Sequence, residues 1–237
     1  FLPVCLLVYY ALPYRARNLF LTLASYVFYG WWKPWFVTLM MTSTVVDYTA
    51  GRVMSAEGAS ARRRKLALIG SMVTNLGLLG VFKYAMFTQA NINWLIQAFG
   101  GEGFHMLEIT LPIGISFYTF QTLSYSIDVY RRELEPTSDF LDFALYVSFF
   151  PQLVAGPIER AKRLLPQVQH PRSPSERDLR VGSYLVLLGL FKKVVIADNM
   201  AILVNHIFSQ APGSLSAWDC LVGVYAFAFQ IYGDFHG

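Results

Sequence analysis

The sequence predicts an all-α, polytopic integral membrane protein. Hydrophobic residues make up 55% of its 237 residues and charged residues only 14%, whereas about a quarter of a soluble domain is charged. Mean hydropathy is +0.42. The apolar residues are grouped into segments that approach the roughly 20 residues needed to cross a bilayer. We therefore expect one membrane domain over residues 1–237, with about seven or eight hydrophobic segments, one of them re-entrant.

Hydrophobic grouping places the individual segments. Those near membrane-spanning length are residues 16–32, 35–51, 66–82, 107–130, 140–158, 181–197 and 215–235. A shorter stretch, 84–99, contains Gln89, Asn91 and Asn93 and is expected at the membrane interface. Continuous runs such as "LGLLGVF" favour helices over the alternating strands of a membrane barrel. The chain begins without Met and ends inside an apolar run, so we expect it to be a fragment.

Basic residues orient these segments. One cluster is "ARRRK" at 61–65, and a second group of six Lys and Arg residues lies within 159–180. Short loops rich in Lys and Arg stay cytoplasmic, so both loops are expected on that side. A nucleic-acid interface is not favoured, because no aromatic platform is interleaved with these charges. The segment 140–158 then begins and ends on the same side, which a full crossing does not allow.

The motif "SFFPQLVAGPIER" at 148–160 resolves this conflict. Pro151 and Pro157 each remove a backbone donor, and Gly156 adds flexibility between them. Freed backbone groups are tolerated at membrane depth only where protein or a water-lined cavity satisfies them. We therefore predict a re-entrant element that Pro151, Gly156 and Pro157 shape, with Gln152 available to a polar interior.

Two acidic residues lie close to the ends of predicted spans. A charge inside a span costs roughly 2.5–3.5 kcal/mol on insertion scales, so it is functional or locally paired. Asp128 precedes Arg131 and Arg132 by three and four residues, and Asp47 lies five residues before Arg52. We expect local, structural pairing at both positions in preference to catalysis.

Other polar residues within the spans have two interpretations. Lys192 and Lys193 interrupt "LVLLGLFKKVVIA", where one of them could face a polar cavity or pair with a buried carboxylate. In "FQIYGDFHG", Gln230 and Asp234 share a helix face at a spacing of four residues. They could form structural hydrogen bonds or line a polar cavity. Tyr232 alternates with them along the chain.

The sequence lacks the phosphate-binding loops, nucleophile elbows and metal-ligand patterns of common soluble enzymes, and no metal site is predicted. The residues by themselves therefore do not distinguish a membrane enzyme from a transporter. A transporter would be expected to show internal repeats with paired broken helices, and only one broken segment is found. A non-catalytic membrane scaffold is a further alternative.

Three motifs resemble those of the membrane-bound O-acyltransferase family. They are "LPIGISFYTFQTLSYSIDVYR" at 111–131, "FFPQLVAGPIER" at 149–160 and "FQIYGDFHG" at 229–237, in this order and with suitable spacing. "ASYVFYGWWKPWF" at 24–36 and "LGLLGVFKYAMF" at 76–87 are similar to the bacterial branch that contains the alginate O-acetyltransferase membrane subunit. The resemblance covers nearly the whole chain.

The resemblance implies a multi-pass protein of the bacterial inner membrane. It implies transfer of an acyl group, expected to be acetyl, to hydroxyls of an exported polysaccharide such as alginate or another cell-wall polymer. The donor would be a cytoplasmic acyl thioester, either acetyl-CoA or an acyl-carrier protein, with no cofactor bound. Periplasmic acetylation proteins would be partners, and nucleic acid would not.

The same resemblance places the catalytic histidine outside this chain. In the family it follows the "QIY-x-DF" motif by several tens of residues in a Trp-His-Gly context, which would lie beyond Gly237. None of the four histidines matches it, and His236 stands where the family has Ser. We therefore assign no catalytic residue within the chain. The residues predicted to line a cavity or the re-entrant element are Pro151, Gln152, Gly156, Pro157, Gln230, Tyr232 and Asp234.

Overall fold

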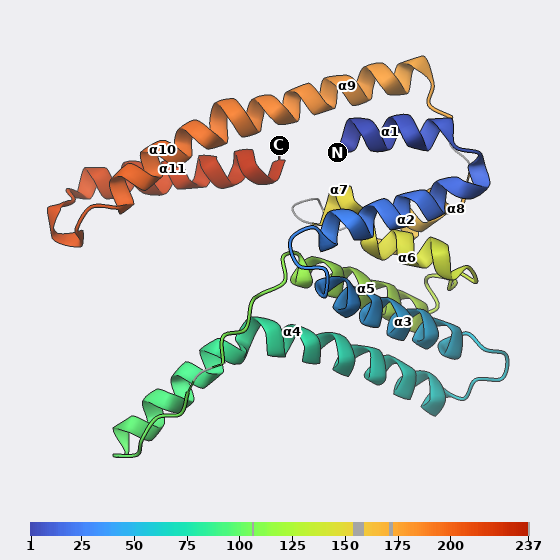
Figure 1. Ribbon diagram of the computed structural model, residues 1–237, viewed down its shortest axis with the longest axis horizontal. Coiled ribbons are helices and arrows are strands. Elements are labelled where there is room, and N and C mark those ends of the chain that lie inside the picture. Colours follow the sequence, from blue (N-terminus) through green and yellow to red (C-terminus); the bar gives the residue numbers. More distant parts are fainter. Residues whose placement is uncertain (106, 154–158, 171–172, 237) are drawn as a thin grey trace. The chain divides into compact units, whose positions relative to one another are not determined.

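A computed structural model describes residues 1–105, 107–153, 159–170 and 173–236. These residues form helices joined by loops, with no strand among them (Figure 1), so the all-α prediction is confirmed. The chain divides into two compact units, Phe1–Pro171 and Arg172–Gly237. The prediction of a single membrane domain stays a prediction.

Unit 1 is built around the contacts of α3 with α4 and α5, and of α2 with α6. Its core is unusually aromatic, since the largest fully buried side chains include Phe36, Tyr118, Tyr125, Phe143 and Tyr146. Rings of this size dominate the buried area and fix neighbouring helices through tilted and edge contacts. The helices of unit 1 are α1 (Leu2–Ala11), α2 (Tyr14–Gly30), α3 (Phe36–Met54), α4 (Ala61–Ala98), α5 (Ile115–Tyr130), α6 (Phe140–Ser148), α7 (Phe150–Leu153) and α8 (Ala161–Gln169).

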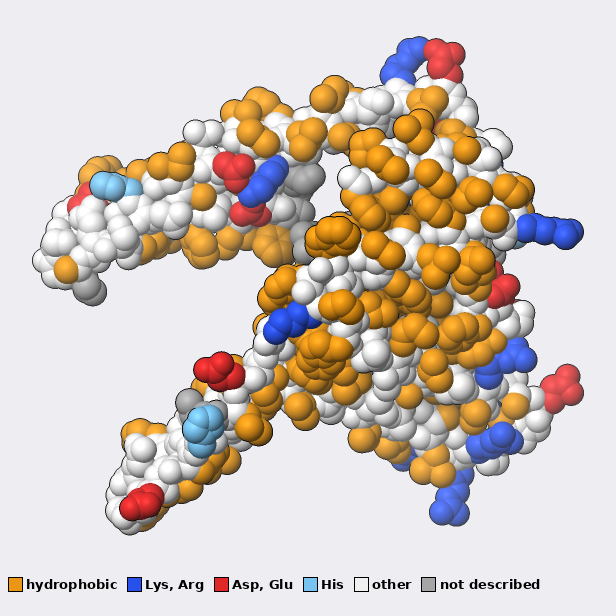
Figure 2. Space-filling view, in the orientation of Figure 1, with side chains coloured by type: hydrophobic (Ala, Val, Ile, Leu, Met, Phe, Trp, Pro, Cys, Tyr) orange, Lys and Arg blue, Asp and Glu red, His pale blue; other side chains and the backbone are white. Residues whose placement is uncertain are grey.

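Large apolar side chains cover much of the surface of both units (Figure 2). Examples in unit 1 are Leu23, Val27 and Val73, all more than half exposed. A surface of this kind suits hydrocarbon better than water. Among the described helices, α4 alone is both long and apolar enough to cross a membrane. The number of membrane crossings therefore stays a prediction.

The interfacial position predicted for 84–99 stays a prediction, but residues 84–98 are no separate element, because they continue helix α4. Its amides bind the chain that returns along the helix. Asn93 Nδ2 donates to the Phe104 carbonyl at 2.8 Å, and the Phe104 amide donates to Asn93 Oδ1 at 2.7 Å. The Leu107 amide donates to Gln89 Oε1 at 2.9 Å. The polar residues that suggested a boundary satisfy a non-helical backbone instead.

The predicted helical segment 107–130 begins later than expected. Residues 107–114 form no helix, and α5 starts at Ile115. Pro112 lies just upstream, and Gly114 at the helix N-cap has φ 77°, a left-handed conformation that favours glycine. Apolar composition alone could not place this start.

Helices α6 and α8 form a hairpin in which the start of α6 lies beside the end of α8. Asp139 caps α6 by accepting a hydrogen bond from the Leu141 amide at 2.7 Å. Asn18 Nδ2 donates both to Asp142 Oδ1 near the start of α6, at 2.8 Å, and to the Val168 carbonyl near the end of α8, at 3.0 Å. The chain therefore enters and leaves this hairpin at the same end of unit 1, as a re-entrant element requires.

An exposed ion pair also holds α8 in place. Lys162 Nζ lies 2.6 Å from Glu133 Oε2 in the loop before α6. This hydrogen bond holds the pKa of the Glu133 carboxyl below its usual range. The pair is therefore intact at neutral pH and is lost only as the pH falls through that lowered pKa.

Unit 2 consists of α9 (Glu176–Leu190), the π-helix η1 (Phe191–Ala197), α10 (Asp198–Phe208), the short η2 (Pro212–Ser214) and α11 (Ala217–His236). Helix α11 packs antiparallel on η1 and α10 through small residues. A side chain at Gly223 would press on Phe208, and one at Gly233 would press on the Lys192 carbonyl. Close approach at glycines is typical of helix pairs in membranes. The helical chain extends beyond the predicted segment 181–197, because α10 continues to Phe208.

Candidate functional site

The proline-containing motif places one predicted residue in the interior. Gln152 lies in α7 and is buried, and its Nε2 has no hydrogen-bond partner among the described residues. Pro151 beside it is exposed. Gly156 and Pro157 lie outside the described residues. A buried amide donor without a partner costs about 1–3 kcal/mol, so Gln152 is a group that a water molecule or a substrate could satisfy.

Two of the sequence motifs meet at one glycine. A Cβ added to Gly114, at the start of α5, would overlap the backbone carbonyl of Leu153. Leu153 is the residue after Gln152 and is almost fully buried. The left-handed turn before α5 therefore sets the position of α7 directly, and with it the position of the Gln152 amide.

A buried polar network that the sequence interpretation missed joins α3, α4 and α5. Asp47 on α3 is fully buried and accepts hydrogen bonds from the hydroxyls of Ser71 and Ser126, the latter at 2.7 Å. Asn75 Nδ2 donates to the second carboxylate oxygen at 2.7 Å. Thr122 donates to Asn75 Oδ1 at 3.3 Å. The partners come from other helices, and a local pairing of Asp47 with Arg52 is therefore wrong.

The helical register explains this correction. Ser71 and Asn75 are four residues apart on α4, and Thr122 and Ser126 are four apart on α5, so each pair lies on one helix face. Both faces are buried against α3. The two i,i+4 pairs of small polar residues were the available signal in the sequence.

The second acidic residue also departs from expectation. Asp128 is buried, and no ion pair joins it to Arg131 or Arg132 within the described part of the chain. Helix α5 ends at Tyr130, so the two arginines lie beyond its last turn and are exposed. Arg132 has φ 61°, and this left-handed backbone breaks the helical spacing that the sequence suggested.

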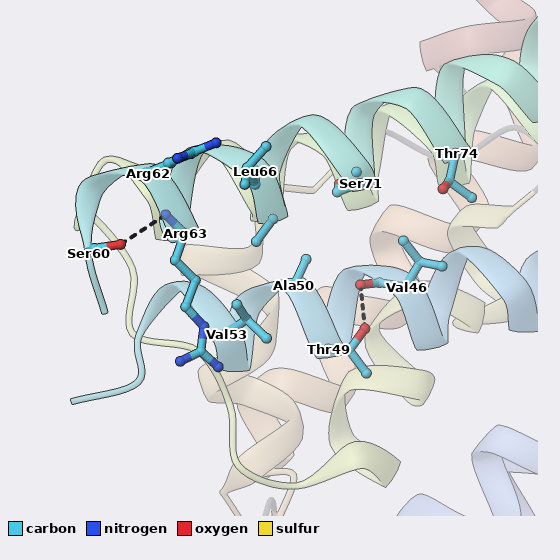
Figure 3. A pocket seen from close by; sticks show the side chains of 12 residues that line it. Val46, Thr49, Ala50, Val53, Ser60, Arg62, Arg63, Leu66, Ser71 and Thr74 are labelled. Carbon is cyan, nitrogen blue, oxygen red and sulfur yellow. Dashed lines mark hydrogen bonds between the residues drawn. The ribbon is translucent and has the colours of Figure 1, made fainter. Parts of the chain in front are cut away.

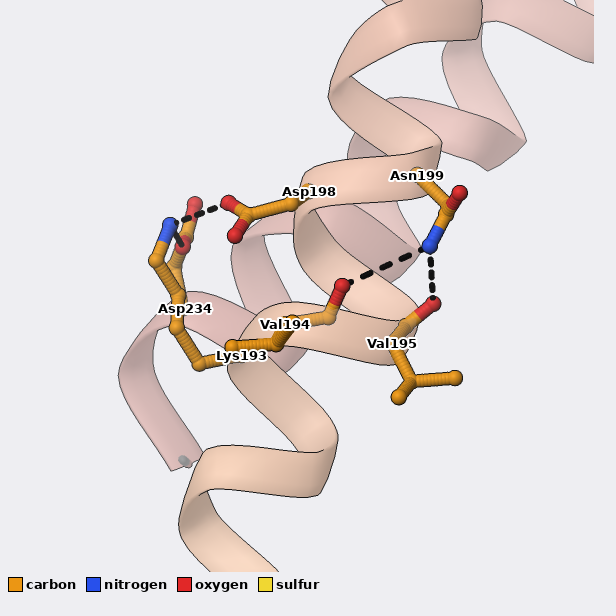
Figure 4. Close-up of polar contacts among 6 residues, drawn as sticks. All are labelled: Lys193, Val194, Val195, Asp198, Asn199 and Asp234. Atoms are coloured by element: carbon orange, nitrogen blue, oxygen red, sulfur yellow. Dashed lines mark hydrogen bonds and ion pairs between the residues drawn. The ribbon is translucent and has the colours of Figure 1, made fainter.

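Unit 2 contains a charged cluster that includes a predicted site residue. Lys193 Nζ lies 2.7 Å from Asp234 Oδ1 of α11 and 2.7 Å from Asp198 Oδ1 at the start of α10 (Figure 4). In a π-helix, hydrogen bonds join residues five apart, which brings Lys193 and Asp198 to the same face. Lys193 thus pairs with carboxylates, but both are partly exposed, so the buried carboxylate that one interpretation expected is wrong.

The other polar residues of "FQIYGDFHG" lie outside this charged cluster. Lys192 Nζ lies 2.7 Å from His236 Nδ1, and because an ammonium group only donates, this ring nitrogen must accept. Tyr232 is exposed and its ring lies 5.0 Å from that of His236. Gln230 has a buried Oε1 without a partner among the described residues. Asp234 and His236 thus form no oriented pair.

A polar cavity of about 860 Å³ lies at the loop ends of α3, α4 and α5 in unit 1. Its lining includes three arginines, Arg52, Arg64 and Arg132, and two acidic residues, Glu57 and Glu135. Arg64 is held in place by donating to the Tyr130 carbonyl at 2.5 Å, and its guanidinium stacks over the Tyr130 ring. Arginine forks suit phosphate or carboxylate groups.

These observations define a helical protein with an apolar exterior, a hydroxyl- and amide-rich interior and a hairpin whose two ends lie together at one end of unit 1. The family profile of MBOAT, membrane-bound O-acyltransferase, matches residues 19–232. The chain belongs to the membrane-bound O-acyltransferase family.

Curated relatives place it within this family. The chain is 43% identical to a probable alginate O-acetylase AlgI of Pseudomonas aeruginosa, over 100% of this chain and 45% of the relative. It is 41% identical to a protein of the same name from Azotobacter vinelandii, over 47% of that relative. A peptidoglycan O-acetyltransferase of Helicobacter pylori is 34% identical, with 50% of it covered. The chain spans about half the length of the relatives it matches.

Proposed function

We propose that this chain is part of an inner-membrane O-acyltransferase that transfers an acetyl group to hydroxyls of an exported polysaccharide. The observation that carries the proposal is similarity over the whole chain to proteins named for O-acetylation of two different polymers, alginate and peptidoglycan. Both names specify a carbohydrate-containing acceptor. The proposed acceptor class is therefore an exported polymer that carries free hydroxyls.

The proposed chemistry is acyl transfer from a thioester. The acceptor hydroxyl oxygen attacks the thioester carbonyl carbon while a general base removes its proton. The tetrahedral intermediate then collapses, the carbon–sulfur bond breaks, and the thiol leaves with a proton. The family resemblance assigns the base to a histidine outside residues 1–237. Residues 1–237 would hold and align the reactants, which can supply much of the rate enhancement.

The polar loop cavity suits a donor that arrives from the cytoplasm. Acetyl-CoA and the phosphopantetheine arm of an acyl-carrier protein both carry phosphate, and Arg52, Arg64 and Arg132 line this cavity. The "ARRRK" cluster beside it predicts a cytoplasmic location through the positive-inside rule. A donor on this side and an acceptor on the other require a protein that thins the barrier between them.

The hairpin of α6 to α8 would provide that thinning as a re-entrant element. Its outer ends are tied by Asn18, and it carries the buried Gln152 inward. Periplasmic acetylation proteins would receive or present the polymer. The cavity-lining roles of Gln230, Tyr232 and Asp234 belong to the same proposal.

Complementation of a bacterium that lacks the full-length gene tests this function. We expect the gene to restore ester-linked acetate on the exported polymer, measured by acetate release on mild alkaline treatment. Export of normal amounts of unacetylated polymer without the gene supports an acyltransferase. A loss of polymer export itself would indicate a transporter, and restoration by a full-length protein without its family histidine would indicate a scaffold.

Replacement of two polar groups should impair transfer. We expect Gln152→Ala and Asp234→Ala in the full-length protein each to lower acetate incorporation by roughly tenfold, because a mispositioned reacting group costs rate steeply. Membrane levels, measured by immunoblotting, should stay normal. The control for Gln152→Ala is Gln167→Ala on α8. The control for Asp234→Ala is Asp198→Asn, because Lys193 then keeps its ion pair with Asp234. Near-normal activity in both test variants would make these groups structural only.

A further inference from the structure

A groove between α3 and α4 has a basic end and an otherwise apolar lining. Its volume is about 550 Å³, and it is separate from the arginine-lined loop cavity. Figure 3 shows α4 above and α3 below it, with Arg62 and Arg63 at the end where α4 begins. The rest of the lining consists of Ser60, the N-cap of α4, and of small and aliphatic residues of the two helices: Val46, Thr49, Ala50, Val53, Leu66, Ala67, Gly70, Ser71 and Thr74.

Small side chains keep the groove open. Gly70 faces free space, since a Cβ placed there would meet no atom within 4 Å. Ala50 and Ala67 leave room on either side, and the Ser71 hydroxyl is turned inward to Asp47. An apolar depression of this kind on the surface of a membrane helix pair accommodates hydrocarbon chains.

The length of the groove corresponds to one leaflet. Residues 63 to 74 of α4 span about 16 Å at 1.5 Å per residue, and half of a hydrocarbon core is about 15 Å thick. The basic end coincides with the "ARRRK" cluster, where the sequence changes from charged to apolar at Leu66. A lipid with its head at this cluster would therefore lay one acyl chain along the groove.

The basic end is suited to an anionic head group. Arg62 and Arg63 are exposed, and neither forms an ion pair within the described residues. The groove lining contains no Asp or Glu. Figure 3 shows Arg63 reaching from α4 towards Val53 of α3, and Ser60 caps the helix at the Arg63 amide. The positive end of the α4 dipole adds to the charge of both guanidinium groups.

We propose that this groove binds an anionic phospholipid, with its phosphate on Arg62 and Arg63 and one acyl chain between α3 and α4. Charge complementarity selects the anionic head group, and the length of the apolar groove selects a lipid with an acyl chain over a free phosphate. The site is independent of acyl transfer. It would fix the depth of the α3–α4 pair in the cytoplasmic leaflet and hence the depth of the Asp47 network.

Native mass spectrometry of the full-length protein tests the site, using phosphatidylglycerol and phosphatidylcholine with the same acyl chains. We expect tighter retention of phosphatidylglycerol. The double variant Arg62→Gln, Arg63→Gln should lower its affinity by roughly tenfold or more, since each basic residue near the membrane surface contributes substantially. Lys65→Gln removes a charge from the same helical turn but lies outside the groove lining, and it should have little effect.

A second pair of variants tests the acyl-chain path. Gly70→Leu fills the groove and should reduce retention of phosphatidylglycerol. Gly77→Leu, two turns further along α4, also projects into free space but does not line the groove, and it should leave retention unchanged. Equal retention of the two lipids would overturn the proposal. So would equal losses for Lys65→Gln and the double arginine variant, or unchanged binding in Gly70→Leu.

Discussion

Asp47→Ala should destabilise the protein strongly, because it removes the acceptor that three buried donors share. The substitution leaves the Ser71 and Ser126 hydroxyls and one N–H of the Asn75 amide without their acceptor in the interior of three packed helices. The other N–H of Asn75 keeps its bond to the Ser71 carbonyl. An unsatisfied buried donor costs about 1–3 kcal/mol. The contribution of one hydrogen bond between membrane helices to stability is smaller, about 0.6 kcal/mol on average. We therefore expect the free energy of unfolding to fall by about 2–4 kcal/mol.

Thermal unfolding of the full-length protein in detergent would measure this loss. Thr49→Ala is the matched control on the same helix, because the Thr49 hydroxyl is exposed and bonds only to carbonyls of its own helix. It should shift the unfolding temperature very little. Asp47→Asn keeps one oxygen for the two serines but presents an amide group to Asn75, so its effect should be intermediate. Equal unfolding temperatures for Asp47→Ala and Thr49→Ala would contradict a structural role for the network.

The Asp47 network also shows where sequence reasoning is limited. Composition and the grouping of apolar residues were sufficient for the all-α class, because every long apolar run can satisfy its backbone only as a helix in hydrocarbon. The partner of a buried charge is different. Arg52 is near Asp47 in the chain, but burial in a three-helix contact depends on the relative rotation of α3, α4 and α5, which periodicity does not specify.

Segment boundaries were limited in the same way. Gln89 and Asn93 looked like the polar edge of an interfacial segment, whereas they bind the backbone of residues 104–107 from within a continuous helix. For the candidate site, the interior position of Gln152 was predicted from its place between two prolines. A carboxylate partner for Lys192 or Lys193 was one interpretation of the sequence, but the partner residue was not named. The π-helix that brings Asp198 close to Lys193 has no signal in the sequence.

Gly114→Ala should be the most informative change to the backbone. At φ 77° alanine adopts a left-handed conformation that costs about 1–2 kcal/mol. The added methyl group would also overlap the Leu153 carbonyl, and a backbone atom cannot rotate away as a side chain can. We expect a fall in the free energy of unfolding of at least about 2 kcal/mol and a loss of polymer acetylation, because α7 and the Gln152 amide must shift.

Gly100→Ala separates the two causes. Gly100 has a similar φ of 79°, and a Cβ placed there meets nothing within 4 Å, so its substitution introduces the conformational cost without the overlap. The difference between the two variants in unfolding temperature and in acetate incorporation therefore measures the Gly114–Leu153 contact alone. If the two variants lower the unfolding temperature and acetate incorporation equally, the conformational cost of the left-handed backbone explains the whole effect and the overlap with Leu153 contributes nothing. If Gly114→Ala alone abolishes acetylation while its membrane level stays normal, the close approach of the two motifs positions the reacting groups.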